Sequence, residues 1–297
     1  MGLFAYGRRL LASLVVLGAA GVAQAEPLRV GTISETPRED IEDFLPLARH
    51  LETRLQGTGY DGVELVMQPT IERMADAMRE GAVDVFVDSP MPSVVVNARS
   101  GGRMALRRWK GGVAEYRSVV FVRRGGPVRS IEDLRGHLLA MEDPFSSSGH
   151  LLPRLALMRA GLGFEALDSP RAAVPDGRVG YAFTGDDGNT VQWVLRDRAA
   201  AGVMAEGDLQ ELQREEGVEF DVVFASPVVP RHVVNLGPGV SKEAERALVA
   251  ILTEMEGTPE GLAALEAFEQ TTRFDPIPPD MRAFLDEVAS ELDGLLR

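Results

Sequence analysis

The chain has 297 residues, of which 45% are hydrophobic and 26% charged, a composition that excludes intrinsic disorder and can supply the cores of two lobes. Asp and Glu total 45 against 31 Lys and Arg, a net charge of −14, so the protein is expected to avoid nucleic acid and anionic membranes. The absence of cysteine excludes disulfides, thiolate metal sites and cysteine nucleophiles.

Residues 1–25 have the pattern of a signal peptide rather than a retained anchor helix. Arg8 and Arg9 precede an apolar run, 10–23, that is too short to span a bilayer comfortably, and AQA at 23–25 is a small-x-small cleavage pattern. We expect cleavage after Ala25, through the general secretory route with twin-arginine export as the alternative, and a periplasmic location. Loss of the two arginines takes the net charge from −14 to −16.

Strands and helices are predicted in alternation from residue 28. Period-two and helical patterns predict strands at 28–34, 63–69 and 83–90, with helices at 37–56 and 70–81 between them. Alternation with short turns is typical of a parallel sheet covered by helices.

The middle of the chain repeats this order, and its end is helical. Further strands are predicted at 116–124, 137–144, 178–183 and 201–205, and an extended run at 218–237. Helices are predicted at 130–136 with Ser130 as its cap, at 149–163, at 190–200 with Asn189 or Thr190 as its cap, at 241–255 and at 278–296.

Four predicted strands end in polar, small or glycine residues. These ends read GTISET (31–36), VDSP (87–90), DPFSSSGH (143–150) and FTGDDGNT (183–190). Ligands collect at the carboxyl ends of strands in open parallel sheets, so these segments are the candidate site.

The serine stretch is the most specific of the four. One of Ser146, Ser147 and Ser148 is explained as a helix cap, which leaves two hydroxyls beside the unpaired amides and the positive end of the helix dipole. Gly149 lets the backbone approach a ligand. These residues alone are compatible with both an anion site and a plain capped turn.

Enzyme and cofactor motifs are absent from the sequence. There is no G-x-S-x-G elbow, no nucleotide-binding glycine motif and no metal-ligand spacing among the four histidines. We therefore expect no catalytic residue, metal or cofactor. An exported hydrolase that acts through Ser147 is the least favoured alternative.

DPFSSSGHLLP (143–153) resembles the serine motif of the phosphate/phosphite/phosphonate-type periplasmic substrate-binding proteins of ABC transporters. The likeness extends through YRSVVFVRRGGPVRSIEDLRG (116–136) and VVFASPVVPRHVVN (222–235), and it covers 26–297. It implies a type II periplasmic binding fold: two α/β lobes joined by two β crossover segments, with a ligand cleft between them. The expected lobes are 26–117 plus 225–297 and 118–224.

The resemblance also implies a small oxyanion ligand, and by motif position it carries over Ser146, Ser147, Ser148 and Tyr116 as ligand contacts. The strand ends and the turns beside them add the other candidates: Thr32, Ser34, Asp88 and Ser89 in the first lobe, and Gly149, His150, Thr184, Asp187 and Asn189 in the second. The expected partner is an ABC permease, or alternatively the periplasmic domain of a sensor kinase. A monomer is expected, since no feature of the sequence requires an oligomer.

The chain departs from the family pattern at DSPMP (88–92) and TGDDGNT (184–190). A carboxylate such as Asp88, Asp187 or Glu35 could accept a proton from a protonated oxyanion. That would favour hydrogen phosphate, phosphite or arsenate and reject sulfate, since an unprotonated anion would face a like charge.

Overall fold

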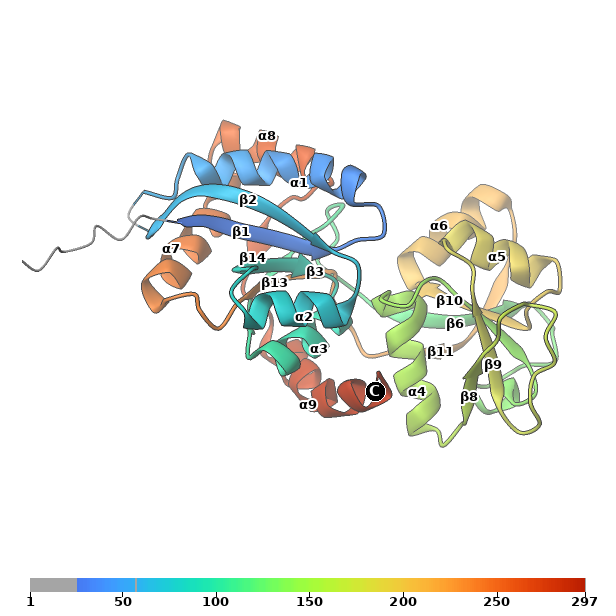
Figure 1. Ribbon diagram of the computed structural model, residues 1–297. Coiled ribbons are helices and arrows are strands. Elements are labelled where there is room, and N and C mark those ends of the chain that lie inside the picture. Colours follow the sequence, from blue (N-terminus) through green and yellow to red (C-terminus); the bar gives the residue numbers. More distant parts are fainter. Residues whose placement is uncertain (1–25, 57, 297) are drawn as a thin grey trace, which may run out of the picture.

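The computed structural model describes residues 26–56 and 58–296, so the expected signal peptide lies outside the described residues. The described chain forms two α/β lobes that lie side by side (Figure 1). Within 26–56 and 58–296, no helix is long and apolar enough to cross a membrane.

Lobe 1 is built on a six-stranded sheet in the order β14-β4-β13-β3-β1-β2. Its strands are β1 (Glu26–Ile33), β2 (Tyr60–Gln68), β3 (Val85–Asp88), β4 (Arg103–Arg108), β13 (His232–Leu236) and β14 (Phe274–Asp275). β1, β2 and β3 are parallel, whereas β13, β4 and β14 pair in antiparallel fashion. Gly31 is required in β1, because a Cβ there would lie 2.3 Å from the carbonyl oxygen of Val66 on β2.

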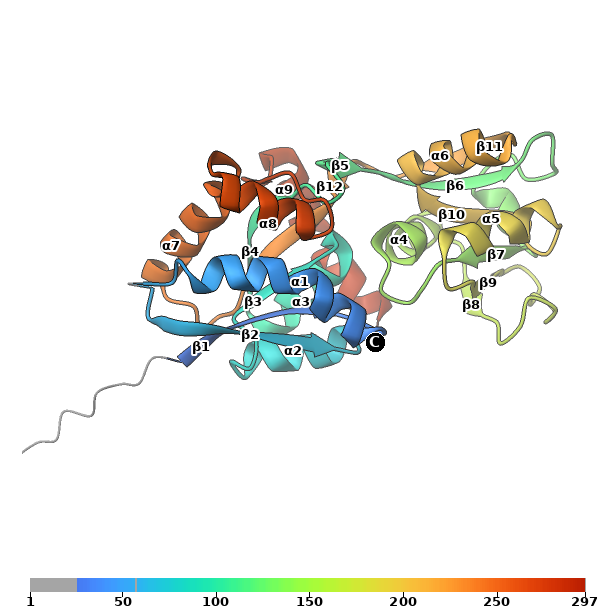
Figure 2. The ribbon, with the colours of Figure 1, turned by 90° about the horizontal axis from the view of Figure 1, so that it is seen from above.

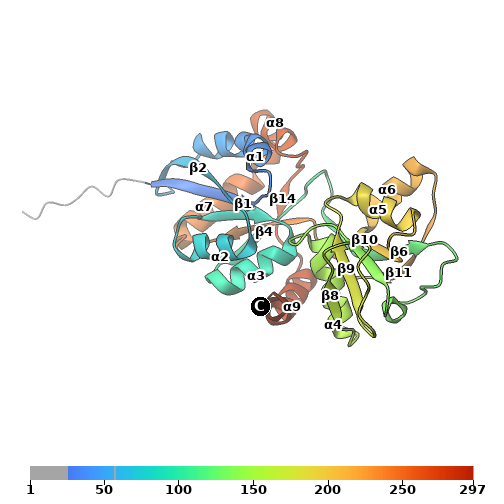
Figure 3. The same cartoon turned by 45° about the vertical axis from the view of Figure 1, so that its right-hand side comes forward.

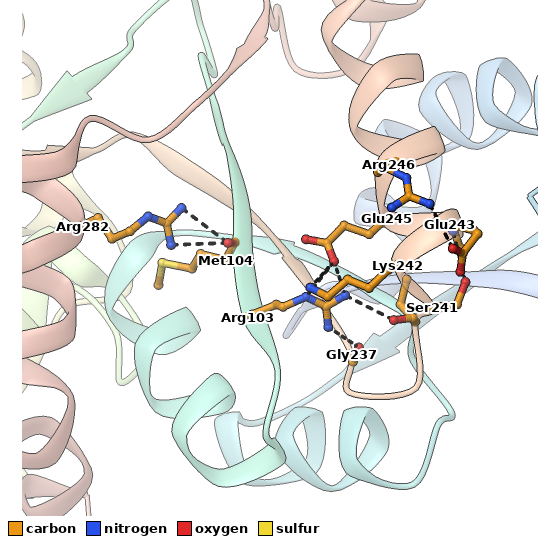
Figure 4. Close-up of polar contacts among 11 residues, drawn as sticks. Arg103, Met104, Gly237, Ser241, Lys242, Glu243, Glu245, Arg246 and Arg282 are labelled. Carbon is orange, nitrogen blue, oxygen red and sulfur yellow. Dashed lines mark hydrogen bonds and ion pairs between the residues drawn. The ribbon is translucent and has the colours of Figure 1, made fainter.

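Helices cover both faces of the lobe 1 sheet (Figure 1). One face carries α1 (Pro37–Glu52), α7 (Lys242–Thr253) and α8 (Pro259–Ala267); the other carries α2 (Ile71–Arg79), α3 (Pro90–Ser100) and α9 (Pro279–Leu295). Each face has its own apolar core. Arg103 on β4 pairs with Glu245 on α7 at 2.7 Å, which fixes that helix to the sheet (Figure 4).

Lobe 2 is built on a second six-stranded sheet in the order β11-β6-β10-β7-β9-β8. Its strands are β6 (Ser118–Arg123), β7 (Leu138–Met141), β8 (Phe164–Ala166), β9 (Val179–Phe183), β10 (Ala201–Ala205) and β11 (Phe220–Ala225). Its helices are α4 (Leu152–Arg159), α5 (Asp187–Leu195) and α6 (Glu206–Glu216), with a 3-10 turn at Glu132–Leu134 and a π turn at Ser147–Leu151.

Two extended crossovers connect the lobes. β5 (Glu115–Tyr116) leads into β6, and β11 leads back through β12 (Val229–Pro230) into β13. β5 and β12 pair in antiparallel fashion and form a narrow bridge between the lobes (Figure 2). The predicted type II periplasmic binding fold is thus confirmed, while the lobe boundaries at 117/118 and 224/225 stay a prediction.

Two predicted helix caps are wrong. Ser130 caps no helix through its side chain. Its backbone amide and that of Arg129 donate instead to the carboxylate of Asp133, which belongs to the 3-10 turn itself. The cap of α5 is Asp186, whose Oδ1 accepts from the Asn189 amide at 2.6 Å, because the helix begins earlier than its apolar pattern.

The sequence pattern also missed α3. Its start, Ser89-Pro90-Met91-Pro92, directly follows a predicted strand and contains two prolines, yet proline is tolerated in the first turn of a helix, where its missing N–H costs nothing.

A candidate ligand cleft between the lobes

A cavity of about 230 Å³ lies between the lobes and is lined by residues of both. Seven predicted residues line it: Asp88, Ser89, Tyr116, Ser146, Ser147, Ser148 and Asp187. Seven others line it that were not among the predicted site residues: Lys110, Glu142, Asp143, Phe145, Asp208, Arg231 and His232.

The three serines in the lobe 2 wall have three different roles. Ser146 caps the π turn, because its Oγ accepts from the Gly149 amide at 2.8 Å. The Ser147 Oγ accepts from the Met91 amide at 2.9 Å and donates to the Ser89 Oγ at 3.0 Å, so it joins lobe 2 to the start of α3 in lobe 1. The Ser148 hydroxyl makes no hydrogen bond to another described residue. The hydroxyl protons of Ser146 and Ser148 thus remain available to a ligand.

Asp143 holds the serine loop in shape. Its Oδ1 accepts from the amides of Phe145, at 2.8 Å, and Ser146, at 2.6 Å. Burial raises the pKa of Asp143 to about 6, and the neighbouring Glu142 contributes to that rise.

Asp88 is the polar end of β3 in the lobe 1 wall. Its carboxylate accepts from the Thr32 hydroxyl at 3.0 Å and from the amides of Ile33 and Ser89, at 3.1 Å and 2.6 Å. Burial nevertheless raises the pKa of Asp88, because the ionised carboxylate lies away from water.

Asp187 stands at the first turn of α5, on the lobe 2 side. Burial, with Glu142 and Asp208 nearby, raises its pKa to about 7. Its Oδ1 is buried and has no hydrogen-bond partner among the described residues. A ligand that carries a proton toward this oxygen would satisfy it.

Two cations and one histidine line the lobe 1 side of the cavity. Lys110 pairs with Glu269, whereas the Arg231 guanidinium forms no ion pair with a described residue and lies 5.2 Å from the centre of the Tyr116 ring. Burial lowers the pKa of His232 well below its usual value, and the neighbouring Lys110 adds to this effect, so the imidazole is neutral. The Nδ1 atom of His232 is also without a partner among the described residues.

The other six predicted site residues do not line the cavity. The Thr32 hydroxyl is bonded to Asp88, and the Ser34 hydroxyl to Asp40. Thr184 Oγ1 donates to the Met141 carbonyl at 3.0 Å, and the Asn189 side chain bonds to Asp186. Their role in ligand binding stays a prediction.

Gly149 and His150 lie behind the serine loop. A Cβ on Gly149 would lie 2.4 Å from the Cβ of Glu142, so this glycine is needed for close packing. The His150 Nδ1 lies 2.7 Å from the Pro144 carbonyl oxygen. Because His150 is occupied in this way, it is no base for Ser147.

Sequence reasoning overlooked Lys110, Arg231 and His232 because they flank the crossovers rather than strand ends. A signal was present, since Arg231 lies directly after β12 and Lys110 lies in the loop between β4 and β5, in a chain that is acidic overall. In a two-lobe fold the crossovers form the back of the cleft, so such residues are candidates for ligand contacts.

A larger cavity of about 500 Å³ lies at the far end of lobe 2 and is not the candidate site. Its wall includes Arg123 at the end of β6, Leu138 at the start of β7 and Ala200 directly before β10, so it faces away from the strand carboxyl ends. Arg123 is paired with Asp197 at 2.8 Å. All residues of this wall belong to lobe 2, so the cavity does not bring polar groups of two lobes together as the cleft does.

No group of three or more His, Cys, Asp or Glu within the described ranges has the arrangement of a metal site. The cleft instead combines hydroxyl donors, an unpaired guanidinium and carboxyls whose raised pKa values let them hold or accept a proton. This combination suits a small polar anion with a hydrogen on one of its oxygens.

Solved structures share this architecture. XAC2383 from Xanthomonas citri bound to ATP is 27% identical, with a TM-score of 0.83, covering 91% of this chain and 98% of that one. PhnD1 from Prochlorococcus marinus (MIT 9301) in complex with methylphosphonate is 14% identical, with a TM-score of 0.63 and coverage of 91% and 99%, and shows a shared fold.

A curated relative is a protein of Escherichia coli (strain K12) named as a proposed aliphatic sulfonates-binding protein. It is 24% identical over 166 residues, which are 55% of this chain and 48% of that protein. The match therefore spans about half the length of the curated relative.

The family model described as "ABC transporter, phosphonate, periplasmic substrate-binding protein" matches residues 30–281. That span contains the lobe 2 sheet, the lobe 1 sheet except the start of β1, both crossovers and every residue of the cleft wall. The family consists of binding proteins and not of enzymes, in agreement with the expected lack of catalysis. The chain belongs to the phosphonate-type periplasmic substrate-binding proteins of ABC transporters.

Proposed function

We propose that the protein captures a small phosphate-like oxyanion (phosphate, phosphite or a phosphonate) in the interlobe cleft and delivers it to an ABC permease. The proposal includes export to the periplasm with cleavage after Ala25 and action as a monomer. Family membership supports the class of protein, and the cleft supports the class of ligand.

The observation that carries the proposal is the unpaired guanidinium of Arg231. It shares the cavity with the hydroxyls of Ser146 and Ser148, which come from the other lobe and have hydrogens to donate. Donors from opposite lobes that line one cavity would be satisfied together by an oxyanion, and such a ligand favours closure.

The carboxyl groups argue for phosphonate over sulfonate. Five carboxyls line the cavity: Asp88, Glu142, Asp143, Asp187 and Asp208. A bare sulfonate has no proton to offer and would face like charges, whereas a phosphate-type anion keeps a proton up to a pH of about 6 and can donate it. XAC2383, a relative bound to ATP, also accepts a ligand with phosphate groups.

A thermal-shift panel with phosphate, phosphite, methylphosphonate, arsenate and sulfate tests this proposal. A ligand at a hundred times its dissociation constant stabilises the protein by about 2.7 kcal/mol, which shifts Tm by roughly 5–10 °C in a chain of this size. We expect a shift with one or more of the phosphorus or arsenic anions and none with sulfate. An unchanged Tm with all five anions would refute the oxyanion assignment.

The arginine can be tested with a matched pair of variants. Arg231→Ala should abolish the shift, while Arg246→Ala, which removes an exposed arginine on α7 paired with Glu243, should leave it unchanged (Figure 4). A full shift in Arg231→Ala would show that the anion binds elsewhere.

A further inference from the structure

Helices α4 and α9 lie against each other across the gap between the lobes (Figures 1 and 3). α4 follows the serine loop in lobe 2, and α9 packs mainly on α3 in lobe 1. This contact lies apart from the β5–β12 bridge, so it constrains how the lobes can move.

Ion pairs join the exposed sides of the two helices. The Arg159 guanidinium on α4 pairs with Glu291 at 2.7 Å and with Glu287 at 2.9 Å, both on α9. Its Nε and Nη2 atoms each donate to Glu291, a bidentate contact that fixes the geometry better than a single bond.

Apolar side chains fill the contact behind these pairs. Leu152 and Leu155 of α4 belong to the same buried cluster as Leu285, Val288 and Leu292 of α9. All five are at most 3% exposed. Separation of the lobes along this contact would expose them to water, so the contact favours the joined arrangement.

Arg154 connects this contact to the serine loop. Its Nη2 donates to the Leu295 carbonyl of α9 at 3.1 Å, and its Nη1 lies 3.2 Å from the His150 Nε2. The Pro144 carbonyl only accepts and arginine only donates, so His150 is neutral with its hydrogen on Nδ1. Pro144 belongs to the segment that leads into Ser146–Ser148.

We infer that α4 and α9 form a clasp that holds the lobes closed without a ligand, and that Arg154 joins this clasp to the serine loop through His150. Ligand affinity then depends on the clasp, because the apparent dissociation constant rises as the binding-competent closed fraction falls. This inference goes beyond the proposed function and holds for any ligand of the cleft.

The clasp can be tested by an interlobe distance measurement without ligand. The chain has no native cysteine, so Glu52→Cys on α1 and Gln210→Cys on α6 give two exposed sites for spin labels, one on each lobe. Double electron–electron resonance should show a single short distance in the otherwise native protein.

Arg159→Glu is the decisive variant, because it places a third carboxylate beside Glu287 and Glu291. We expect a second, longer distance and a fall of roughly 2- to 10-fold or more in the ratio of closed to open protein. Combining Arg159→Glu with Glu287→Arg and Glu291→Arg should restore the short distance. Arg246→Ala is the matched control and should retain it, since its pair with Glu243 lies on α7, away from the clasp (Figure 4).

Arg154→Met tests the connection to the loop, because methionine keeps much of the apolar packing and removes both hydrogen bonds. The longer distance should appear, and the affinity for any anion that binds should fall by a similar factor. A distance distribution in Arg159→Glu that matches the native protein would overturn the clasp. A failure of every anion to bind would refute the proposed function and leave the distance test valid.

Discussion

The Ser147 hydroxyl is the polar group that joins the two lobes within the cleft. It accepts from the Met91 amide and donates to the Ser89 hydroxyl. A hydroxyl has one hydrogen, and that of Ser147 is thereby used within the protein. Ser147 therefore stabilises closure, and the neighbouring Ser146 and Ser148 offer their hydrogens to the ligand.

Ser147→Ala should weaken ligand binding about tenfold without unfolding the protein. The buried Met91 amide would lose its acceptor, which costs about 1–3 kcal/mol in the closed state. Isothermal titration calorimetry measures the affinity, and circular dichroism checks the fold. An unchanged affinity would reduce Ser147 to a packing residue.

Asp187 should make stability depend on pH. Its pKa is raised from 3.8 to about 7, so between these values the native state binds more protons than the unfolded state. The stabilisation that this group contributes is complete below pH 3.8 and is lost as pH rises through about 7.

Asp187→Asn should remove this part of the pH dependence and stabilise the protein by more than about 1 kcal/mol at pH 8, because no buried charge is then formed. Urea unfolding at pH 5 and pH 8 measures both effects. If the unfolding free energy of Asp187→Asn changed with pH as much as that of the native protein, the raised pKa of Asp187 would be contradicted.

At the scale of elements, the serine loop is shaped by close packing against the end of β7. Gly149 approaches Glu142 so closely that an added Cβ would lie 2.7 Å from the Glu142 Oε2 and 3.0 Å from the Ser146 Oγ. The capping hydrogen bond of Ser146 depends on this approach.

Gly149→Ala should destabilise the protein by about 1–3 kcal/mol through overpacking and should weaken ligand binding. Gly207→Ala in α6 is the control, because an added Cβ there meets nothing within 4 Å. Equal urea midpoints for the two variants would show that the loop adapts without cost.

Most strands and helices could be predicted because their apolar spacing reflects burial in a sheet or on one helix face. Strands β4, β8 and β14 and helices α6 and α8 were not predicted. Helix α3 was not predicted either, because two prolines in its first turn resemble a loop when the helix behind them is unknown. The caps of α5 and of the 3-10 turn failed for a local reason: in each case an aspartate carboxylate accepts from the backbone amide of a residue that was predicted to be the cap, Asn189 or Ser130.

The candidate site was partly predictable. The serines, Asp88, Asp187 and Tyr116 follow strands or begin one, where a pattern can find them. Arg231 and Lys110 come together with them only through the crossovers, over more than 30 residues of separation from the serine loop, and no local pattern encodes such a contact. The sequence places these basic residues near the crossovers, and the tertiary structure is needed to show that they reach the same cavity as the serine loop.

At the scale of the molecule, the lobes are joined in three places: the β5–β12 bridge, the hydrogen bonds of Ser147 and the contact of α4 with α9. The hydrogen bonds of Ser147 lie in the cleft wall, which Tyr116 of the bridge also lines, whereas the contact of α4 with α9 lies outside it. A ligand in the cleft binds a molecule whose lobes are already held near one another. Its binding therefore needs to supply only the additional free energy that favours the closed arrangement.

The most direct test of this account compares methylphosphonate with methanesulfonate by isothermal titration calorimetry at pH 6. The two anions have nearly the same shape, but only the phosphonate carries a proton for the carboxyls of the cleft. The account predicts that methylphosphonate binds at least about tenfold more tightly, a difference of about 1.4 kcal/mol. Equal affinities, or tighter binding of methanesulfonate, would contradict it.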